Sequence, residues 1–78
     1  MQDTHFFIDY SQRIRSSNGH PRDNEFFIKD GQHIFGPKNS AKYWIEGDQI
    51  LSDQGDTGFR IMPDKKIFGP SQQLPWFD

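Results

Sequence analysis

Eight isoleucines recur along the chain in four pairs, and this spacing limits the possible folds more than any other feature of the sequence. The residue two places before the first isoleucine of each pair is aromatic. Side chains alternate between the two faces of a strand, so the aromatic residue and that isoleucine share a face. The pattern predicts four copies of one β-hairpin, with Phe6, Ile8 and Ile14 in the first, Phe26, Ile28 and Ile34 in the second, Tyr43, Ile45 and Ile50 in the third, and Phe59, Ile61 and Ile67 in the fourth.

The residues between the two isoleucines of a copy predict how its strands pair. Four residues separate Ile45 from Ile50. A two-residue turn at Gly47-Asp48, of type II′ because glycine comes first, would place these isoleucines opposite each other. The other copies have five intervening residues, so a three-residue loop such as 63–65 with a β-bulge would give the same pairing.

The second copy allows two registers. Asp30-Gly31 favours a two-residue type I′ turn, which would pair Phe27 with Ile34. A three-residue loop would instead pair Ile28 with Ile34. We adopt the pairing of isoleucines because it is common to all four copies, and the sequence alone leaves the other register open.

In the isoleucine register each hairpin has a second face with its own side-chain pair, and the pairs are Phe7 with Arg15, Phe27 with Phe35, Trp44 with Leu51, and Arg60 with Phe68. Neighbouring copies would cover this face if its role is structural. An uncovered aromatic patch would instead form a homo-oligomer interface or bind a small-molecule or peptide ligand. The candidate binding residues are Phe27, Phe35, Trp44 and Phe68.

The composition favours strands and a small core. Ala41 is the only alanine, and the two leucines are Leu51 and Leu74, so the strongest helix formers are almost missing. With 78 residues, 32% of them hydrophobic, we expect a single domain, residues 1–78, with a thin core. The chain has no cysteine that could add a disulfide or a thiolate metal site. Self-association is therefore expected to contribute to stability.

Charge and hydropathy narrow the classes of partner. The net charge of −2 and the pI of about 5.8 argue against nucleic acid and against an anionic membrane surface as partners. No apolar run approaches the roughly 18 residues of a transmembrane helix. Residues 1–5 lack the basic-then-apolar layout of a signal peptide, so the expected location is the cytoplasm.

The sequence contains no clear signature of catalysis or metal binding. His5, His20 and His33 do not have the spacing of a helical metal motif, and residues 52–58 lack the spacing and closing glutamate of an EF-hand. GxGxxG, Walker and GxSxG motifs are also missing. We therefore expect no catalytic residue, metal or cofactor. The alternative is a small enzyme whose site lies between subunits and includes His33 and an acidic residue such as Asp30.

Glycine, proline and the C-terminal aromatics mark the ends of the repeats. Gly36-Pro37 and Gly69-Pro70 each follow a second strand, where proline stops ladder pairing and glycine permits a sharp exit. Residues 38–42 are expected to be a linker and residues 52–58 a loop. The tail 74–77 is expected to plug the core or cover a sheet edge, and the rival interpretation is a tail that swaps onto a partner subunit.

The stretch Phe26–Pro37, its counterpart at 59–70 and the closing Leu74-Pro75-Trp76 resemble small uncharacterised bacterial proteins made of repeated short hairpins. Some of these are described as a fourfold β-flower. The resemblance covers roughly residues 6–76 and implies four hairpins around a pseudo-fourfold axis, without implying a function. The first copy departs most, because it lacks Gly-Pro and is followed by a long loop.

A second resemblance is to GYF-like adaptor domains, which bind proline-rich peptides. It is carried by Phe26–Pro37 followed by Lys38-Asn39-Ser40, which is under a quarter of the chain. That family needs an amphipathic helix after the proline, and residues 43–48 do not supply one.

These patterns predict an all-β domain of four β-hairpin repeats with pseudo-fourfold symmetry, closed as a flower or small barrel so that no sheet edge stays open. The function that fits best is a non-enzymatic binding or interaction module that self-associates through its aromatic second face. The alternatives are a small enzyme with its site at a subunit interface and an adaptor for proline-rich peptides.

Overall fold

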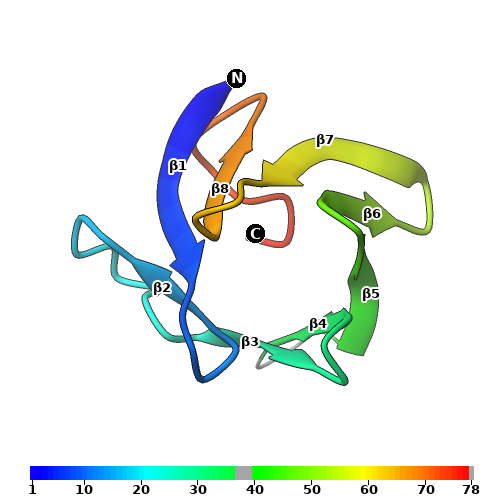
Figure 1. The fold of residues 1–78 in the computed structure, drawn as a ribbon, viewed down its shortest axis with the longest axis horizontal. Helices are drawn as coiled ribbons and strands as arrows, with labels where there is room; N and C mark the ends of the chain where they lie inside the picture. Colours follow the sequence, from blue (N-terminus) through cyan, green and yellow to red (C-terminus); the bar gives the residue numbers. More distant parts are fainter. Residues whose placement is uncertain (37–39, 78) are drawn as a thin grey trace.

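The computed structural model describes residues 1–36 and 40–77 and confirms the all-β hairpin architecture. Each strand pairs antiparallel with the next, and the last pairs with the first, so the sheet closes as a barrel (Figure 1). The strands are β1 (Gln2–Ile8), β2 (Arg13–Ser16), β3 (Phe26–Lys29), β4 (His33–Phe35), β5 (Ser40–Glu46), β6 (Gln49–Ser52), β7 (Gly55–Ile61) and β8 (Lys66–Gly69). The described residues include no helix that is long and apolar enough to cross a membrane.

All four hairpins adopt the isoleucine register. The two isoleucines of each copy lie directly opposite each other, in β1–β2, β3–β4, β5–β6 and β7–β8. The four side-chain pairs expected on the second face are also paired in these ladders. Register is fixed this strongly because a slip of one residue would turn every isoleucine out of the core.

The turn of the second copy satisfies both of its competing signals. Asp30 and Gly31 have φ values of 59° and 68°, and the Gln32 N–H donates to the Lys29 carbonyl at 3.1 Å, as in a type I′ turn. The ladder then resumes with Lys29 opposite His33, so Gln32 is one extra residue in the loop. In the third copy Gly47 has a φ of 64° at the first turn position, which agrees with the predicted type II′ turn.

Backbone hydrogen bonds join successive copies in the same way around the ring. In each copy the N–H of the first isoleucine donates to a carbonyl in the turn of the copy before it. The bonds run from Ile28 to Gln12 at 2.7 Å, from Ile45 to Gln32 at 2.7 Å, from Ile61 to Asp48 at 2.8 Å, and from Ile8 to Lys65 at 3.0 Å. The last bond links the first copy to the fourth and completes the ring.

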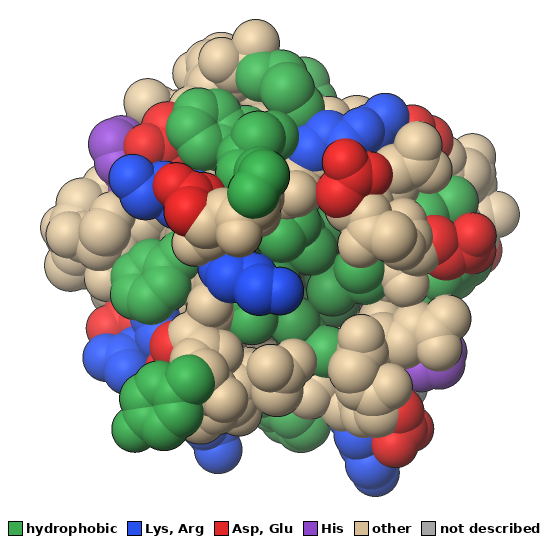
Figure 2. All heavy atoms as spheres, in the orientation of Figure 1, with side chains coloured by type: hydrophobic (Ala, Val, Ile, Leu, Met, Phe, Trp, Pro, Cys, Tyr) green, Lys and Arg blue, Asp and Glu red, His purple; other side chains and the backbone are tan. Residues whose placement is uncertain are grey.

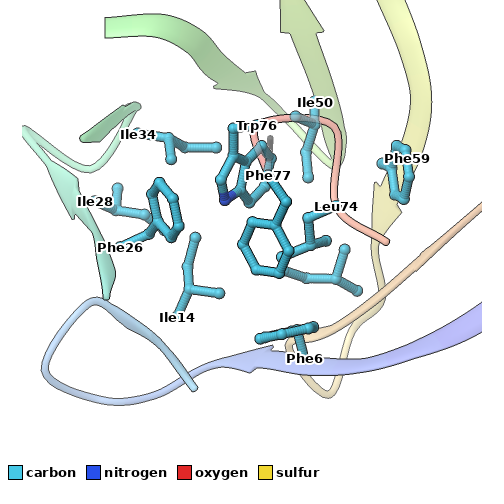
Figure 3. Packing of buried hydrophobic residues seen from close by; sticks show 11 residues of the cluster. Phe6, Ile14, Phe26, Ile28, Ile34, Ile50, Phe59, Leu74, Trp76 and Phe77 are labelled. Atoms are coloured by element: carbon cyan, nitrogen blue, oxygen red, sulfur yellow. The ribbon is translucent and has the colours of Figure 1, made fainter. Parts of the chain in front are cut away.

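The isoleucines point into the barrel, and the C-terminal tail packs among them. This agrees with the expectation that the tail plugs the core. Five isoleucines are buried, and Ile8, Ile45 and Ile61 pack against them. Figure 3 shows Leu74, Trp76 and Phe77 among the inward-facing side chains of the barrel. The Tyr43 hydroxyl donates to the Pro75 carbonyl at 3.1 Å and so ties the tail to β5.

The expected loop at 52–58 is wrong, because β7 already begins at Gly55 and Ser52 pairs with it across a two-residue turn. Gly55 and Gly58 have φ values of 109° and 87°, and a register shift accompanies them in the β6–β7 ladder. Such left-handed glycines let a strand bend without breaking.

The expected linker 38–42 is likewise too long, because β5 starts at Ser40. Residues 37–39, and with them Pro37, lie outside the described residues. Residues 40–46 form a strand, so the helix required by the GYF-like resemblance does not occur at these positions.

Gly36 and Gly69 are required because a side chain at either position would collide with an aromatic ring, and not because the backbone turns sharply there. Neither has a left-handed φ. A Cβ at Gly36 would collide with the Phe26 ring, and a Cβ at Gly69 would collide with the Phe59 ring. In the second and fourth copies the repeat aromatic therefore packs directly against the glycine backbone of its own hairpin.

We expect Gly69→Ala to lower the free energy of unfolding by about 1–3 kcal/mol, since the new methyl group must displace a buried ring. Ser52→Ala is the matched control, because position 52 has the same place in the third copy and already carries a Cβ. Its hydroxyl donates a long hydrogen bond of 3.4 Å to the Gly55 carbonyl and accepts one of 3.2 Å from the Gln54 N–H, so the control loses two weak, partly exposed bonds but displaces no ring. Chemical denaturation measures both variants, and equal stability of the two would contradict the ring-packing role.

Candidate functional site

Three of the four sequence-predicted binding residues lie on neighbouring strands of the outer surface. Phe27 on β3 and Phe35 on β4 are cross-strand partners whose rings stack with centroids 5.9 Å apart and planes 18° apart. Trp44 follows on β5, where it pairs with His33 of β4. Phe27 is 37% exposed, although its neighbours Phe26 and Ile28 are buried. We call Phe27, Phe35 and Trp44 the aromatic face.

Charged groups flank the aromatic face in a fixed order. The Arg13 guanidinium on β2 lies 5.8 Å from the Phe27 ring centroid, and the Lys29 ammonium lies 5.6 Å from that of Phe35. On the other side, the Trp44 indole N–H donates to the Glu46 carboxylate at 3.0 Å. The outer surface therefore carries cations on β2 and β3 and the Glu46 carboxylate beside Trp44 on β5, where the exposed Lys42 lies toward the start of the strand.

The fourth predicted residue, Phe68, is not brought to the aromatic face. It lies on β8, on the opposite side of the eight-strand ring from β4. Its ladder partners are Arg60 and Asp3, and Arg60 forms an ion pair of 2.8 Å with Asp56. Phe68 is thus a single ring among charged groups.

The residues considered for an enzymatic alternative are also placed on the outer surface. His33 sits in the β4 ladder between Lys29 and Trp44, and Asp30 occupies the hairpin turn. Neither residue lines the two cavities described below. Within residues 1–36 and 40–77, no cluster of three or more histidines and carboxylates could hold a metal ion.

A cavity of about 450 Å³ lies between β1, the β2–β3 loop and the C-terminal tail. Thr4 and His5 line it from β1, and Gln72, Gln73 and Phe77 line it from the tail. The Thr4 hydroxyl is buried and donates to the Ile67 carbonyl at 2.7 Å, so this wall is part of the barrel itself. We call this space the tail cavity.

The β2–β3 loop forms the remaining wall of the tail cavity with Asn18, His20 and Arg22. One carboxylate oxygen of Asp23 accepts from the Arg15 guanidinium at 3.0 Å and from the Ser16 N–H at 2.8 Å. These bonds explain why a long polar loop can hold a defined shape.

Aromatic contacts fix two of the loop side chains against the tail. The His20 ring packs 5.1 Å from the Phe6 centroid and 5.4 Å from that of Phe77. The Arg22 guanidinium lies 4.6 Å from the Phe77 centroid and binds Glu25 in bidentate fashion, at 2.6 and 3.1 Å. The His20 Nδ1 accepts from the Arg22 backbone N–H at 3.0 Å, so Nε2 carries the ring proton.

His5 has an unusual backbone in the wall of this cavity. Its φ is 64°, in the left-handed region that residues other than glycine adopt infrequently, although asparagine, aspartate and histidine are enriched there. The segment Asp3-Thr4-His5-Phe6 is repeated as Asp56-Thr57-Gly58-Phe59, where Gly58 takes the left-handed position with a φ of 87°. This second repeat is not part of the isoleucine pattern, but it can be recognised in the sequence from the Asp-Thr-x-Phe that ends at the repeat aromatic of two copies.

The two segments share one hydrogen-bonding scheme. The first aspartate accepts from the N–H two residues later, at 2.8 Å for His5 and 2.9 Å for Gly58. The threonine hydroxyl donates to an isoleucine carbonyl of a neighbouring strand, at 2.7 Å from Thr4 and 2.6 Å from Thr57. Because the bulge is built identically with glycine, the histidine is not required for the fold.

A smaller cavity of about 140 Å³ lies where the four turns meet, and it is lined by Ile8, Ile28, Ile45 and Ile61 together with Gln12, Gly31, Gly47 and Lys65. The four turn residues all have positive φ. Figure 2 looks down the barrel and shows a hollow floored by hydrophobic side chains, with a positive charge beside it. This volume is below the ~300–1,000 Å³ of ordinary small-molecule sites.

Three aspartates around the barrel have lowered pKa values because each carboxylate accepts hydrogen bonds. The Arg15 side chain and the Ser16 N–H lower the pKa of Asp23. The Ser11 hydroxyl lowers the pKa of Asp9, and the Arg60 guanidinium lowers that of Asp56. All three groups stabilise turns or bulges in their ionised form.

Comparisons of this chain with protein-family models, curated proteins and solved structures find no match.

Lowered carboxylate pKa values predict acid-sensitive stability. Above about pH 5 the three aspartates are ionised in both states, so their contribution is complete. Below their ordinary pKa of 3.8 the unfolded chain takes up protons first, and the free energy of unfolding falls as the pH drops through the folded values. Denaturation between pH 7 and 3 should show this decline, and Asp23→Asn should make it shallower. An unchanged slope in that variant would remove Asp23 from the explanation.

The strained backbone at position 5 predicts an order of stabilities. We expect His5→Gly to be more stable than His5→Ala by about 1 kcal/mol, because alanine keeps the left-handed penalty and glycine does not. Urea denaturation of the two variants measures the difference. At Asp3, whose φ is not in the left-handed region, the alanine variant should be more stable than the glycine variant.

Proposed function

We propose that the protein is a non-enzymatic interaction module that forms a dimer through its aromatic face. The observation that carries the proposal is the order of groups across this surface. Arg13 lies on the β2 side, the stacked rings of Phe27 and Phe35 lie in the middle, and Glu46 lies on the β5 side.

This order suits a twofold contact between two copies of the chain. In a twofold interface a residue i contacts a residue j of the partner, and j contacts i in return. An axis through the stacked rings would bring each Arg13 toward the partner subunit's Glu46. Aromatic residues and arginine are also the types that are enriched at such interfaces.

The size of the chain supports the same proposal. A stable interface buries about 800 Å² on each partner, which is about a sixth of the 4829 Å² surface of this chain. A core of this size contributes only about 3–5 kcal/mol by itself, so added burial at a dimer interface would be a substantial gain. The proposed contact surface extends over four adjacent strands, β2 to β5.

Charge reversal tests the twofold arrangement. We expect Arg13→Glu and Glu46→Arg each to dissociate the dimer, since each variant places like charges opposite each other across the interface. Light scattering should then report an average mass closer to that of the monomer. The double variant restores opposite charges and should recover the dimer. A monomeric wild-type chain, or a double variant as dissociated as either single variant, would refute the proposal.

Ring truncation provides a second test with a matched control. Phe27→Ala and Trp44→Ala should shift the mass toward the monomer while the β-type circular dichroism stays intact. Phe68→Ala removes the same type of side chain from the opposite side of the barrel and should leave the mass unchanged. If Phe68→Ala dissociates the protein as well, the contact surface is not the aromatic face.

A further inference from the structure

We propose that the tail cavity binds a small neutral polyol, of the size of a monosaccharide or disaccharide. This site is separate from the aromatic face, because it is built from β1, the β2–β3 loop and the tail. Its volume of about 450 Å³ falls within the range of small-molecule sites.

The charges around the cavity favour a ligand without net charge. Among the lining residues that the structure describes, Arg22 alone is always charged, and its guanidinium is held by the Glu25 carboxylate. His5 lies with its Nδ1 3.9 Å from the Asp3 carboxylate. No carboxylate is among the described lining residues, so a cationic ligand would find no counter-charge in the wall.

The polar groups of the wall match hydroxyls. The side-chain amides of Gln72 and Gln73 make no hydrogen bond with described residues, and each offers both donors and an acceptor. The His20 Nε2–H is a further donor, because its Nδ1 is occupied by the Arg22 N–H. A hydroxyl both donates and accepts, so it pairs with all of these groups.

An apolar surface completes the site. Phe77 gives the lining a small apolar area, since it is 7% exposed, and its ring is held in place by Phe6, 5.2 Å away with the rings at 82°, and by Phe26 at 5.4 Å. The C–H groups of a sugar ring are apolar and can pack on such a surface, while its hydroxyls reach the amides and the imidazole. A purely apolar ligand would leave those polar groups unpaired, which carries a free-energy penalty.

Position 5 adds a side chain to the wall of the same cavity. The equivalent bulge in the fourth copy uses glycine, and the hydrogen bonds of the two bulges agree within about 0.1 Å. Left-handed side chains also occur in the turns, where Gln12 and Lys65 take the places of Gly31 and Gly47, so the backbone alone does not mark a site. The His5 imidazole lines the tail cavity, and its polar atoms suit a hydroxyl of the proposed ligand.

Amide chemical shifts in ¹H–¹⁵N NMR test the proposal directly. The probes are glucose, galactose, N-acetylglucosamine and maltose, added to tens of millimolar. The expected result is a saturable shift with at least one of them, at the amides of Asn18, His20, Gln72 and Gln73. Inorganic phosphate, citrate and benzene are the charged and apolar comparison probes.

Matched variants separate the site from general effects. Gln73→Ala and His5→Gly should weaken sugar binding at least tenfold, and His5→Gly should do so without a lower melting temperature. Gln54→Ala, on the exposed β6–β7 turn, should bind as the wild type does. The proposal fails if no sugar shifts these amides, if phosphate, citrate or benzene shifts them and sugars do not, or if both cavity variants bind unchanged.

Discussion

The ring of hydrogen bonds between turns is the constraint on which the rest of this structure depends. An isolated two-stranded hairpin is marginal in water, because one of its faces and both of its edges stay open. Here each copy donates one isoleucine N–H to the turn before it, and the bond from Ile8 to Lys65 joins the ends of the series. Closure removes the free edges and directs all eight isoleucines toward one centre, so no single copy could fold in the same way alone.

The inner surface of this barrel was predictable, and the reason is periodicity. Each copy has an aromatic residue and two isoleucines at positions that only a strand pair can place together, and burial of one face then sets the register. The near absence of alanine and leucine predicted that the chain would form no long helix. The turn at Asp30-Gly31 was ambiguous because the sequence signal specifies a turn type and not the number of residues that follow before the ladder resumes.

The tail cavity was not predictable in the same way. Its walls come from residues 4–5, 18–22 and 72–77. These segments are far apart in the sequence, and no local sequence pattern predicts that they lie together. The sequence predicts a loop at Gly55 and Gly58 because glycine in a polar stretch usually marks a turn, whereas in the structure these glycines bend a strand. The repeated Asp-Thr-x-Phe was visible in the sequence, but its meaning depends on φ at the third position.

The four copies agree on the inside of the barrel and differ on the outside. Inner positions are isoleucine or aromatic in every copy, whereas the outer pairs range from Phe27 with Phe35 to Arg60 with Phe68. His5 and Gly58 differ in the same sense at one backbone position. Symmetry therefore accounts for the scaffold, and any specific activity must arise where the copies diverge.

The two tryptophans of the chain report on different parts of the molecule. Trp76 is 2% exposed, its indole N–H has no hydrogen-bond partner within the described residues, and the Phe26 ring stands edge-on 6.1 Å away. Trp44 lies on the outside with its N–H on Glu46. Indole emission moves to longer wavelength in polar surroundings. Trp76 in the buried tail therefore emits at shorter wavelength than Trp44 on the outer surface, so the intrinsic fluorescence of the chain has two components.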